Sequence, residues 1–265
     1  MKKQFFVTTL CTLLLAGYGC TSPQANDEPK DLTQYVDPYI GSGGHGHVFV
    51  GANVPYGLVQ LGPSSIPQEW DWTSGYHISD STVIGFPHMH LSGTGIGDLH
   101  DITLMPVTGE VTYARGVESD QTSGLWSYSD RSKEVVKPGY YATHLLRYNV
   151  DVELTATKRV GFHKYTFNQK ENAAVVFDLQ NGGCWDSPTK AYINKVDDKT
   201  IEGYRYSSGW ANDQRVFFVA EFSEPITSLD VIVDRGEAVA NKGEGKIVYA
   251  RANVDAQKPV YVKVA

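Results

Sequence analysis

Short stretches of this sequence alternate between apolar and polar residues, and a two-residue period is typical of a β-strand that buries one face. Residues 151–157 show the alternation most clearly, reading Asp-Val-Glu-Leu-Thr-Ala-Thr. No stretch of helical length carries an apolar stripe with the 3.6-residue period of an amphipathic helix. Glycine and proline interrupt the apolar stretches throughout. The pattern therefore predicts a chain that is mainly β.

A second kind of segment, Val216–Phe222, is apolar at almost every position, which is typical of a strand buried in the middle of a sandwich. Two further runs between Ala191 and Tyr206 flank the polar residues 197–199 and predict a hairpin. The other predicted strands are Leu58–Leu61, Asp101–Met105, Tyr140–Leu146, Gly161–Phe167, Ala173–Leu179, Leu229–Val233, Lys246–Ala250 and Pro259–Val264. Short strands at this spacing favour a large antiparallel β-sandwich, with a barrel as the alternative.

The N-terminus carries an export signal. A positively charged start is followed by the apolar run Phe5–Ala16, which is too short to span a bilayer, and by small residues before Cys20. We therefore predict a signal peptide over residues 1–20, a flexible polar tether over residues 21–34 and one folded domain over residues 35–265.

Cys20 stands where a bacterial lipoprotein signal has the cysteine that becomes the acylated first residue of the mature chain. Gly17 occupies the position at which such signals usually have leucine, so cleavage without lipidation is the alternative. Processing would remove Cys11 and leave Cys184 as the one thiol of the folded body, so we expect no intrachain disulfide. These residues predict an outer-membrane lipoprotein at the cell surface or the periplasmic face, or a periplasmic protein if Cys20 is not lipidated.

Charge and aromatic content narrow the class of partner. The chain has 23 basic and 30 acidic side chains, a net charge of −7 and no long run of lysine or arginine, which argues against nucleic acid. Its 16 tyrosines and 5 tryptophans suit stacking on sugar rings in an exported protein, although most aromatic residues of a β-rich chain pack in its core.

Two histidine pairs lie in glycine-rich segments. His45 and His47 are two residues apart, so in an extended backbone both side chains would point the same way. His88 and His90 repeat the spacing, with acidic residues shortly after them. Such pairs are compatible with a zinc or two-metal site, but the spacing is unspecific, and histidines that brace glycine-rich loops are the more common case.

A third segment, EWDWTSGYHISDS at residues 69–81, combines indoles with a carboxylate. Indole faces pack on the C–H face of a pyranose, and a carboxylate can accept hydrogen bonds from two vicinal hydroxyls. The alternative is that one tryptophan is core and Asp71 caps a turn. No pair of carboxylates stands out as the acid and base of a glycosidase.

Five long strings of this chain, taken in order, resemble the N-terminal domain of glycoside hydrolase family 92, the bacterial α-mannosidases. The strings are VDPYIGSGGHGHVFVGANVPYGLVQLGP, WDWTSGYHISDS, IGFPHMHLSGTGIGDLHDI, ELTATKRVGFHKYTF and GWANDQRVFFVAEFS. Several long strings in register are far more specific than a short motif. Thr73 and His100 depart from residues that many relatives have there, which bears on the shape of the pocket and hence on linkage preference.

The resemblance implies an exo-acting inverting α-mannosidase, α-1,2 linkages favoured, that trims mannose from N-glycans or mannans. It implies an N-terminal β-supersandwich of the galactose-mutarotase-like kind, followed by an (α/α)6 barrel with the catalytic acid, the base and a Ca²⁺. This chain is then the N-terminal half without its barrel, cut short in a strand before Ala265, and holds no catalytic residue and no metal. Its expected partners are the barrel, a mannose-containing glycan and, through a lipid anchor, the membrane.

The resemblance also implies that a tryptophan of this domain helps to form the leaving-group subsite. The matching loop carries Trp70 and Trp72. Trp70 is the preferred candidate for the sugar contact because it opens the loop. The residues assigned to substrate binding are Trp70, Asp71, Trp72 and His77, and those assigned to the domain interface or to loop bracing are His45, His47, His88 and His90. Two other hypotheses remain: a free-standing glycan-binding surface lipoprotein, and a partner that folds only against a barrel supplied in trans.

Overall fold

The computed structural model describes residues 30–181 and 185–265. The predicted signal peptide, Cys20 and most of the tether lie outside these residues, as does Cys184. The chain divides into two compact units, Met1–Gln34 and Tyr35–Ala265, and the second contains all of the strands named below. Within the described part of the chain, no helix is long and apolar enough to cross a membrane.

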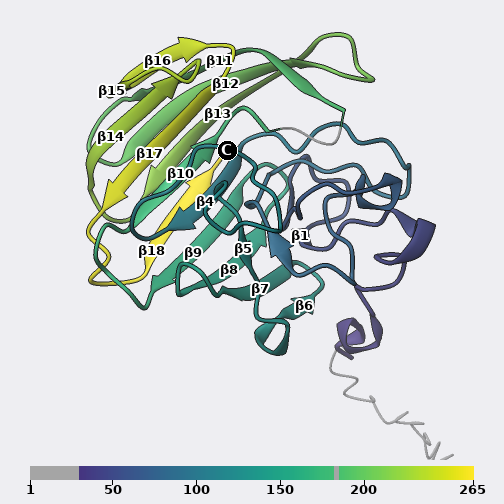
Figure 1. Ribbon diagram of the computed structural model, residues 1–265. Coiled ribbons are helices and arrows are strands. Elements are labelled where there is room, and N and C mark those ends of the chain that lie inside the picture. The colour runs from purple at the N-terminus through teal and green to yellow at the C-terminus, as the bar shows by residue number, and fades with distance from the viewer. Residues whose placement is uncertain (1–29, 182–184) are drawn as a thin grey trace, which may run out of the picture. The chain divides into compact units, whose positions relative to one another are not determined.

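Two antiparallel sheets form the body of this unit (Figure 1). The nine-stranded sheet has the order β16 (Lys242–Gly245), β11 (Ser187–Lys195), β12 (Thr200–Ser208), β13 (Gln214–Phe222), β18 (Val260–Val264), β9 (Gly161–Phe167), β8 (Val150–Ala156), β7 (Tyr140–Leu145) and β6 (Val135–Lys137). The five-stranded sheet has the order β15 (Ala238–Ala240), β14 (Ile226–Val233), β17 (Val248–Val254), β10 (Ala174–Asp178) and β4 (Thr103–Val107).

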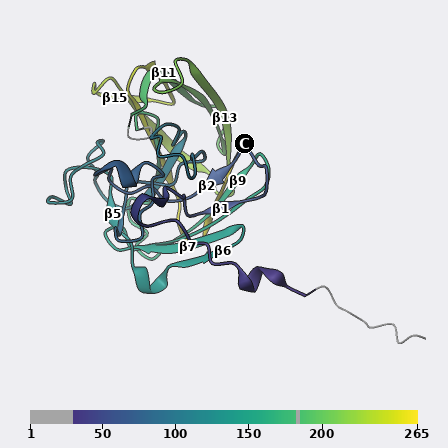
Figure 2. The ribbon, with the colours of Figure 1, turned by 90° about the vertical axis from the view of Figure 1, so that its right-hand side faces the viewer.

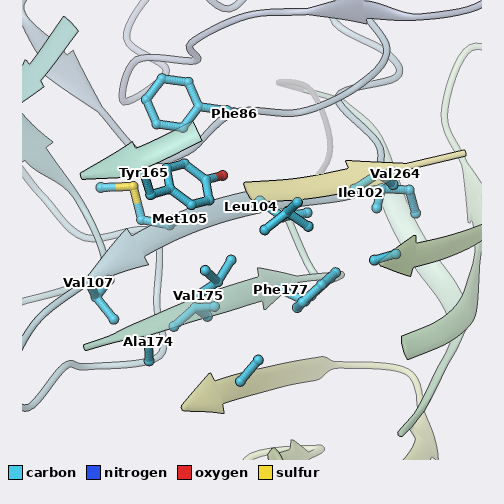
Figure 3. Close-up of a cluster of buried hydrophobic side chains, with 14 of the residues drawn as sticks. Phe86, Ile102, Leu104, Met105, Val107, Tyr165, Ala174, Val175, Phe177 and Val264 are labelled. Atoms are coloured by element: carbon cyan, nitrogen blue, oxygen red, sulfur yellow. The ribbon is translucent and has the colours of Figure 1, made fainter. Parts of the chain in front are cut away.

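The sheets pack face to face around one hydrophobic core. Phe177 of β10 lies parallel to Phe218 of β13, with ring centroids 5.8 Å apart. Phe177 belongs to the same buried cluster as Leu104 of β4 and Tyr165 of β9 (Figure 3). Every residue of β4 and β10 is buried, so both faces of the five-stranded sheet are covered at these strands. The fold is therefore the predicted antiparallel β-sandwich, and the described residues do not form the alternative, a β-barrel.

Strand β13 corrects one detail of the sequence prediction. Val216–Phe222 forms a strand, and it lies between β12 and β18, but it is not buried on both faces. Phe218 is 4 % exposed, whereas Phe217 is 64 % and Val219 43 % exposed. The reason is that in the described residues only one face of the nine-stranded sheet at β13 meets the core. Apolar outward residues such as Phe217 pack instead on neighbouring rings, here Tyr204 at 5.9 Å.

The segment before β4 contains little regular structure. Its elements are the short strands β1 (Ala52–Asn53), β2 (Gln60–Leu61) and β3 (Thr82–Val83), and the 3₁₀ turns η1 (Leu32–Tyr35), η2 (Gly44–Gly46) and η3 (Trp70–Trp72). Beyond β4, the two-residue strand β5 (Ser127–Tyr128) pairs with β3, and the 3₁₀ turn η4 (Arg131–Lys133) precedes β6. Long loops connect these short elements. Because strands β1 and β2 contact β8, the loops lie beside the β7–β9 part of the nine-stranded sheet (Figures 1 and 2). The candidate site is built on them.

Candidate functional site

The Trp-Asp-Trp loop forms the 3₁₀ turn η3, closed by the Thr73 N–H donating to the Trp70 carbonyl at 3.2 Å. Side chains on a turn of this kind do not alternate across a sheet, so the two indoles are not sorted into one core and one surface residue. Trp70 is 52 % exposed and Trp72 is half-buried.

Trp70 is held in place while much of its ring faces solvent. Its indole N–H donates to the Gly95 carbonyl at 2.9 Å, and the ring of His47 lies 4.1 Å from it, centroid to centroid. Gly95 has φ +63°, and a Cβ there would come within 2.7 Å of the Trp70 ring. A glycine at position 95 is therefore required both by its backbone conformation and by the ring. The result is a fixed, half-exposed indole.

Trp72 is engaged inside the domain. Its indole N–H donates to the Asp80 carboxylate at 2.7 Å, and its ring stacks on His77 with centroids 4.2 Å apart and planes 18° apart. His77 is buried and its Nδ1 lies 2.7 Å from the hydroxyl of Ser79. One face and the polar edge of Trp72 are thus occupied by residues of the domain itself.

Asp71 contacts both histidines of the first pair. His45 Nδ1 lies 2.6 Å from Asp71 Oδ1, and His47 Nε2 lies 3.5 Å from the same oxygen. The hydrogen bond from His45 is the main cause that lowers the pKa of Asp71 below its ordinary value. The extended backbone in which this pair would point the same way does not form: η2 precedes His47, which has φ +53°. The two side chains meet at Asp71 because the chain turns, not because a strand aligns them.

The second histidine pair lies in the interior. His88 Nδ1 is 2.6 Å from the Ile102 carbonyl, and His90 Nδ1 is 2.8 Å from the Gln60 carbonyl, so each imidazole donates to the backbone of another segment. His163 of β9 completes the group, its Nε2 lying 2.9 Å from His88 Nε2. Burial lowers the pKa of His88 and of His90 to about 4, which keeps both neutral near pH 7.

These contacts do not support the zinc interpretation. The two predicted pairs lie in different surroundings: His45 and His47 meet at Asp71, whereas His88 and His90 bind backbone carbonyls in the interior. Over residues 30–181 and 185–265, no three or more His, Cys, Asp or Glu side chains are grouped to hold a metal ion. The calcium that the family resemblance implies therefore fits no cluster within these residues.

A hollow of about 330 Å³ adjoins the exposed indole. Its lining residues are Pro67, Gln68, Glu69, Trp70, Thr73 and Trp185. Trp185, which is 49 % exposed, is not among the site residues predicted from the sequence. A single tryptophan after two glycines and a cysteine has no spacing that sets it apart, and only its place across the hollow from the Trp70 loop singles it out.

A larger hollow of about 890 Å³ shares no residue with the first. Arg115, Arg235 and Lys246 are among its lining residues, together with Tyr113 and Tyr249. Size alone would favour it as a ligand site. We place the candidate site at the smaller hollow because two half-exposed indoles and two polar side chains, Gln68 and Glu69, converge there.

The carboxylates of the loops are engaged in structural contacts. Asp80 accepts from Trp72, and Asp101 pairs with Arg205 at 2.6 Å with both side chains fully buried. Asp71 is held by His45, and Asp98 accepts from the Ala211 N–H at 3.1 Å. The geometry is thus that of a binding surface with aromatic and polar groups. No pair of these four aspartates is positioned to act as an acid and a base.

Comparison with known proteins identifies the family. The model of the glycosyl hydrolase family 92 N-terminal domain matches residues 35–265. A family GH92 α-mannosidase from Bacteroides thetaiotaomicron, solved alone and with mannoimidazole, superposes with a TM-score of 0.83 at 34 % identity over 88 % of this chain. An inverting GH92 mannosidase of the same species shares the fold, with a TM-score of 0.69 at 20 % identity and the same coverage.

The matches span only part of the relatives. This chain covers 32 % and 33 % of the two α-mannosidase chains and 31 % of the inverting enzyme. It also matches an uncharacterized secreted glycosidase of Arthroderma benhamiae, with 28 % identity over 144 residues, which are 52 % of this chain and 17 % of that protein. The family model covers the whole described sandwich, so the chain belongs to glycoside hydrolase family 92, and residues 35–265 are its N-terminal domain.

Proposed function

We propose that this domain is the carbohydrate-facing part of an exo-acting inverting α-mannosidase and that Trp70 forms part of the leaving-group subsite. The observation that carries the proposal is the fixed, half-exposed indole of Trp70 beside the hollow. An indole held in one orientation loses little entropy when a sugar stacks on it, which is how aromatic anchors contribute affinity.

Trp70 is a better candidate than Trp72 for the sugar contact. The N–H and one face of Trp72 contact Asp80 and His77. Trp70 uses its N–H to bind the Gly95 carbonyl and keeps more than half of its surface exposed. Asp71 and His77 then act indirectly, Asp71 by fixing the histidines beside Trp70 and His77 by fixing Trp72.

The chemistry itself belongs to the part of the enzyme that this chain does not contain. Inverting hydrolysis needs one carboxylic acid to protonate the leaving oxygen and one carboxylate to activate water. We assign both, and the calcium ion, to the (α/α)6 barrel of the complete enzyme. The proposed substrates are α-mannosides of N-glycans or mannans, with α-1,2 linkages favoured.

We also propose that the protein is exported and anchored by a lipid at Cys20, in the outer membrane. The support is the leader pattern and the secreted state given for the fungal relative. Metabolic labelling with a radioactive fatty acid tests this: the precursor with Cys20→Ser should lose the label. Labelling that persists in the variant would contradict the anchor.

The leaving-group assignment is tested by titrating ¹⁵N-labelled protein with α-1,2-mannobiose at millimolar concentrations and following the indole N–H signals. We expect the Trp70 signal to shift while that of Trp126, which is 0 % exposed, stays fixed. The Trp70→Phe variant identifies the signal. A Trp70 signal that does not move would overturn the assignment.

Catalytic competence is tested separately with the same protein. We expect no mannose release from any α-linked mannobiose by this chain alone, and turnover when a family 92 barrel is supplied with it. Release by the pure chain would overturn the placement of the acid and base in the barrel.

A further inference from the structure

Three tryptophans of the described residues expose about half of their surface or more. Trp70 is 52 %, Trp185 49 % and Trp210 74 % exposed, whereas Trp126 is fully buried. They lie in different segments: Trp70 in η3, Trp185 just before β11, and Trp210 in the turn between β12 and β13. Large exposed apolar groups that recur in one region of a protein are typical of binding surfaces.

One short stretch, Gly95–Asp98, holds all three segments. The Trp70 side chain donates to the Gly95 carbonyl at 2.9 Å. The backbone N–H of Trp185 donates to the Gly97 carbonyl at 3.0 Å. The indole of Trp70 and the backbone of Trp185 are thus attached to carbonyls two residues apart, and both tryptophans line the same hollow.

The third segment is attached to the next residue of that stretch. The Asp98 carboxylate accepts from the Ala211 N–H at 3.1 Å, and the Gly209 N–H donates to the Ala211 carbonyl at 2.9 Å, which closes the turn around Trp210. A Cβ on Gly209 would come within 2.6 Å of Asp98. The close approach of this turn to Asp98 therefore depends on the glycine, and it leaves the Trp210 side chain at the exposed tip.

A buried ion cluster fixes Asp101, three residues beyond this stretch, and the Trp185 segment to the sheet. Arg205 of β12 is 0 % exposed and donates to Asp186 at 2.9 and 3.1 Å and to Asp101 at 2.6 Å. Gln214 of β13 donates to the other oxygen of Asp101. Asp186 directly follows Trp185, so the backbone of this tryptophan is tied on one side to Gly97 and on the other to the sheet.

A contrast with another aromatic cluster indicates which ligand such indoles suit. On the outer face of β11 and β12, Tyr204 stacks on Tyr192 at 5.4 Å and on Tyr206 at 4.6 Å, so these rings cover one another's faces. Among residues 30–181 and 185–265, no aromatic ring packs on Trp185 or Trp210. The exposed surface of these indoles, 49 % for Trp185 and 74 % for Trp210, remains available to a flat apolar partner, and Gln68 and Glu69 supply hydrogen-bonding groups in the hollow lined by Trp70 and Trp185.

We propose that Trp185 and Trp210, together with Trp70, form an aromatic surface that binds successive sugar units on the leaving-group side of the substrate. The proposal rests on the leaving-group role of Trp70 and extends it, because it makes the natural substrate an oligosaccharide and not a disaccharide or a simple glycoside. The volume of the hollow, about 330 Å³, falls in the range of small-molecule sites. Sugars beyond it reach the Trp210 turn.

The experiment compares α-1,2-mannobiose with a linear mannotetraose in the same indole N–H titration of the 265-residue chain. The disaccharide should shift the signal of Trp70, and the tetrasaccharide should shift Trp185 and Trp210 as well. We expect the tetrasaccharide to bind about tenfold more tightly, which corresponds to ~1.4 kcal/mol. Trp210→Ala should reduce that ratio and leave the affinity for the disaccharide unchanged, whereas Trp185→Ala, in the wall of the hollow, should weaken the tetrasaccharide more than the disaccharide.

Phe217→Ala is the matched control, because Phe217 is 64 % exposed but lies in the other aromatic cluster. It should leave both affinities unchanged. A tetrasaccharide that shifts Trp70 alone, or binds no more tightly than the disaccharide, overturns the extended surface and leaves the proposed function standing. Shifts at Trp185 and Trp210 without Trp70 overturn the leaving-group assignment and keep the sugar surface. No shift with either ligand overturns both.

Discussion

Three histidines and two tryptophans of this domain lie in environments opposite to those expected from their polarity. His88, His90 and His163 are buried, at 4 %, 4 % and 0 % exposure, whereas Trp70 and Trp185 are about half exposed. Imidazole is a donor and an acceptor, so it can connect loops whose backbone groups have no strand partner. Indole has one donor and no acceptor, so it can make fewer such connections. An apolar ring kept at the surface by hydrogen bonds and a glycine indicates a binding role, and a buried imidazole indicates a structural one.

The largest predicted effect is a loss of stability in acid, caused by the buried histidines. Burial lowers the pKa of His88 and of His90 to about 4, below the value near 6.5 of an unfolded chain. Between these values the unfolded state binds more protons, so the free energy of unfolding is full above pH 6.5 and falls as the pH drops toward 4. The loss should reach about 3 kcal/mol for each imidazole at pH 4, and about 2 kcal/mol of it should be present by pH 5.

Urea unfolding at pH 7, 6 and 5 measures this loss. His90→Gln keeps a donor for the Gln60 carbonyl and should flatten the pH dependence. His45→Gln makes the same substitution at a histidine whose side chain is 78 % exposed, and it is the control. If the unfolding free energy of the unchanged protein and of both variants depends on pH in the same way, the buried histidines are not the cause.

The ion cluster beneath the tryptophans should show the next largest effect. Arg205→Met leaves Asp101 and Asp186 buried without their cation, and breaking a buried pair in this way costs about 3–5 kcal/mol. Arg215→Met removes a guanidinium from a solvent-exposed pair with Asp213 and should change the unfolding free energy little. A similar cost for both variants, measured by urea unfolding, would contradict the structural role of Arg205.

Two glycines of the same loop test how Trp70 is held. Gly93 and Gly95 both have positive φ, +71° and +63°, but a Cβ on Gly93 meets nothing within 4 Å, whereas one on Gly95 would collide with the Trp70 ring. Gly93→Ala should cost only the backbone strain, about 1–2 kcal/mol. Gly95→Ala should cost more and should also move the Trp70 indole N–H signal. If the two variants behave alike, the ring contact is not what requires a glycine there.

The smallest expected effect on stability separates the two indoles of η3. Trp72→Ala removes the contacts with Asp80 and His77 and should cost about 2 kcal/mol, less than the roughly 3–5 kcal/mol of a fully buried tryptophan. Trp70→Ala should cost less than about 1 kcal/mol, as surface substitutions do, and should abolish the response to mannobiose. The reverse order of stabilities would exchange the roles of the two residues.

Local pattern was enough to predict most of the long strands. Strands β8 and β9 follow the alternation of their residues, and the β11–β12 hairpin follows the polar turn at residues 197–199. The pattern did not predict the short strands β1, β3 and β5 or the edge strands β6, β15 and β16. A strand of two residues has no period to detect, and its pairing depends on segments elsewhere in the chain.

For the candidate site, too, the sequence and the tertiary structure determined different features. The sequence by itself identified the family, the antiparallel sandwich and the Trp-Asp-Trp loop, because each is written in contiguous residues. Only the tertiary structure separated Trp70 from Trp72, brought His45 and His47 to Asp71, and placed Trp185 and Trp210 on the stretch that also holds Trp70. The physical reason is that these contacts join residues up to 113 positions apart. Chain turns and hydrogen bonds between loops decide them, and neither has a period in the sequence.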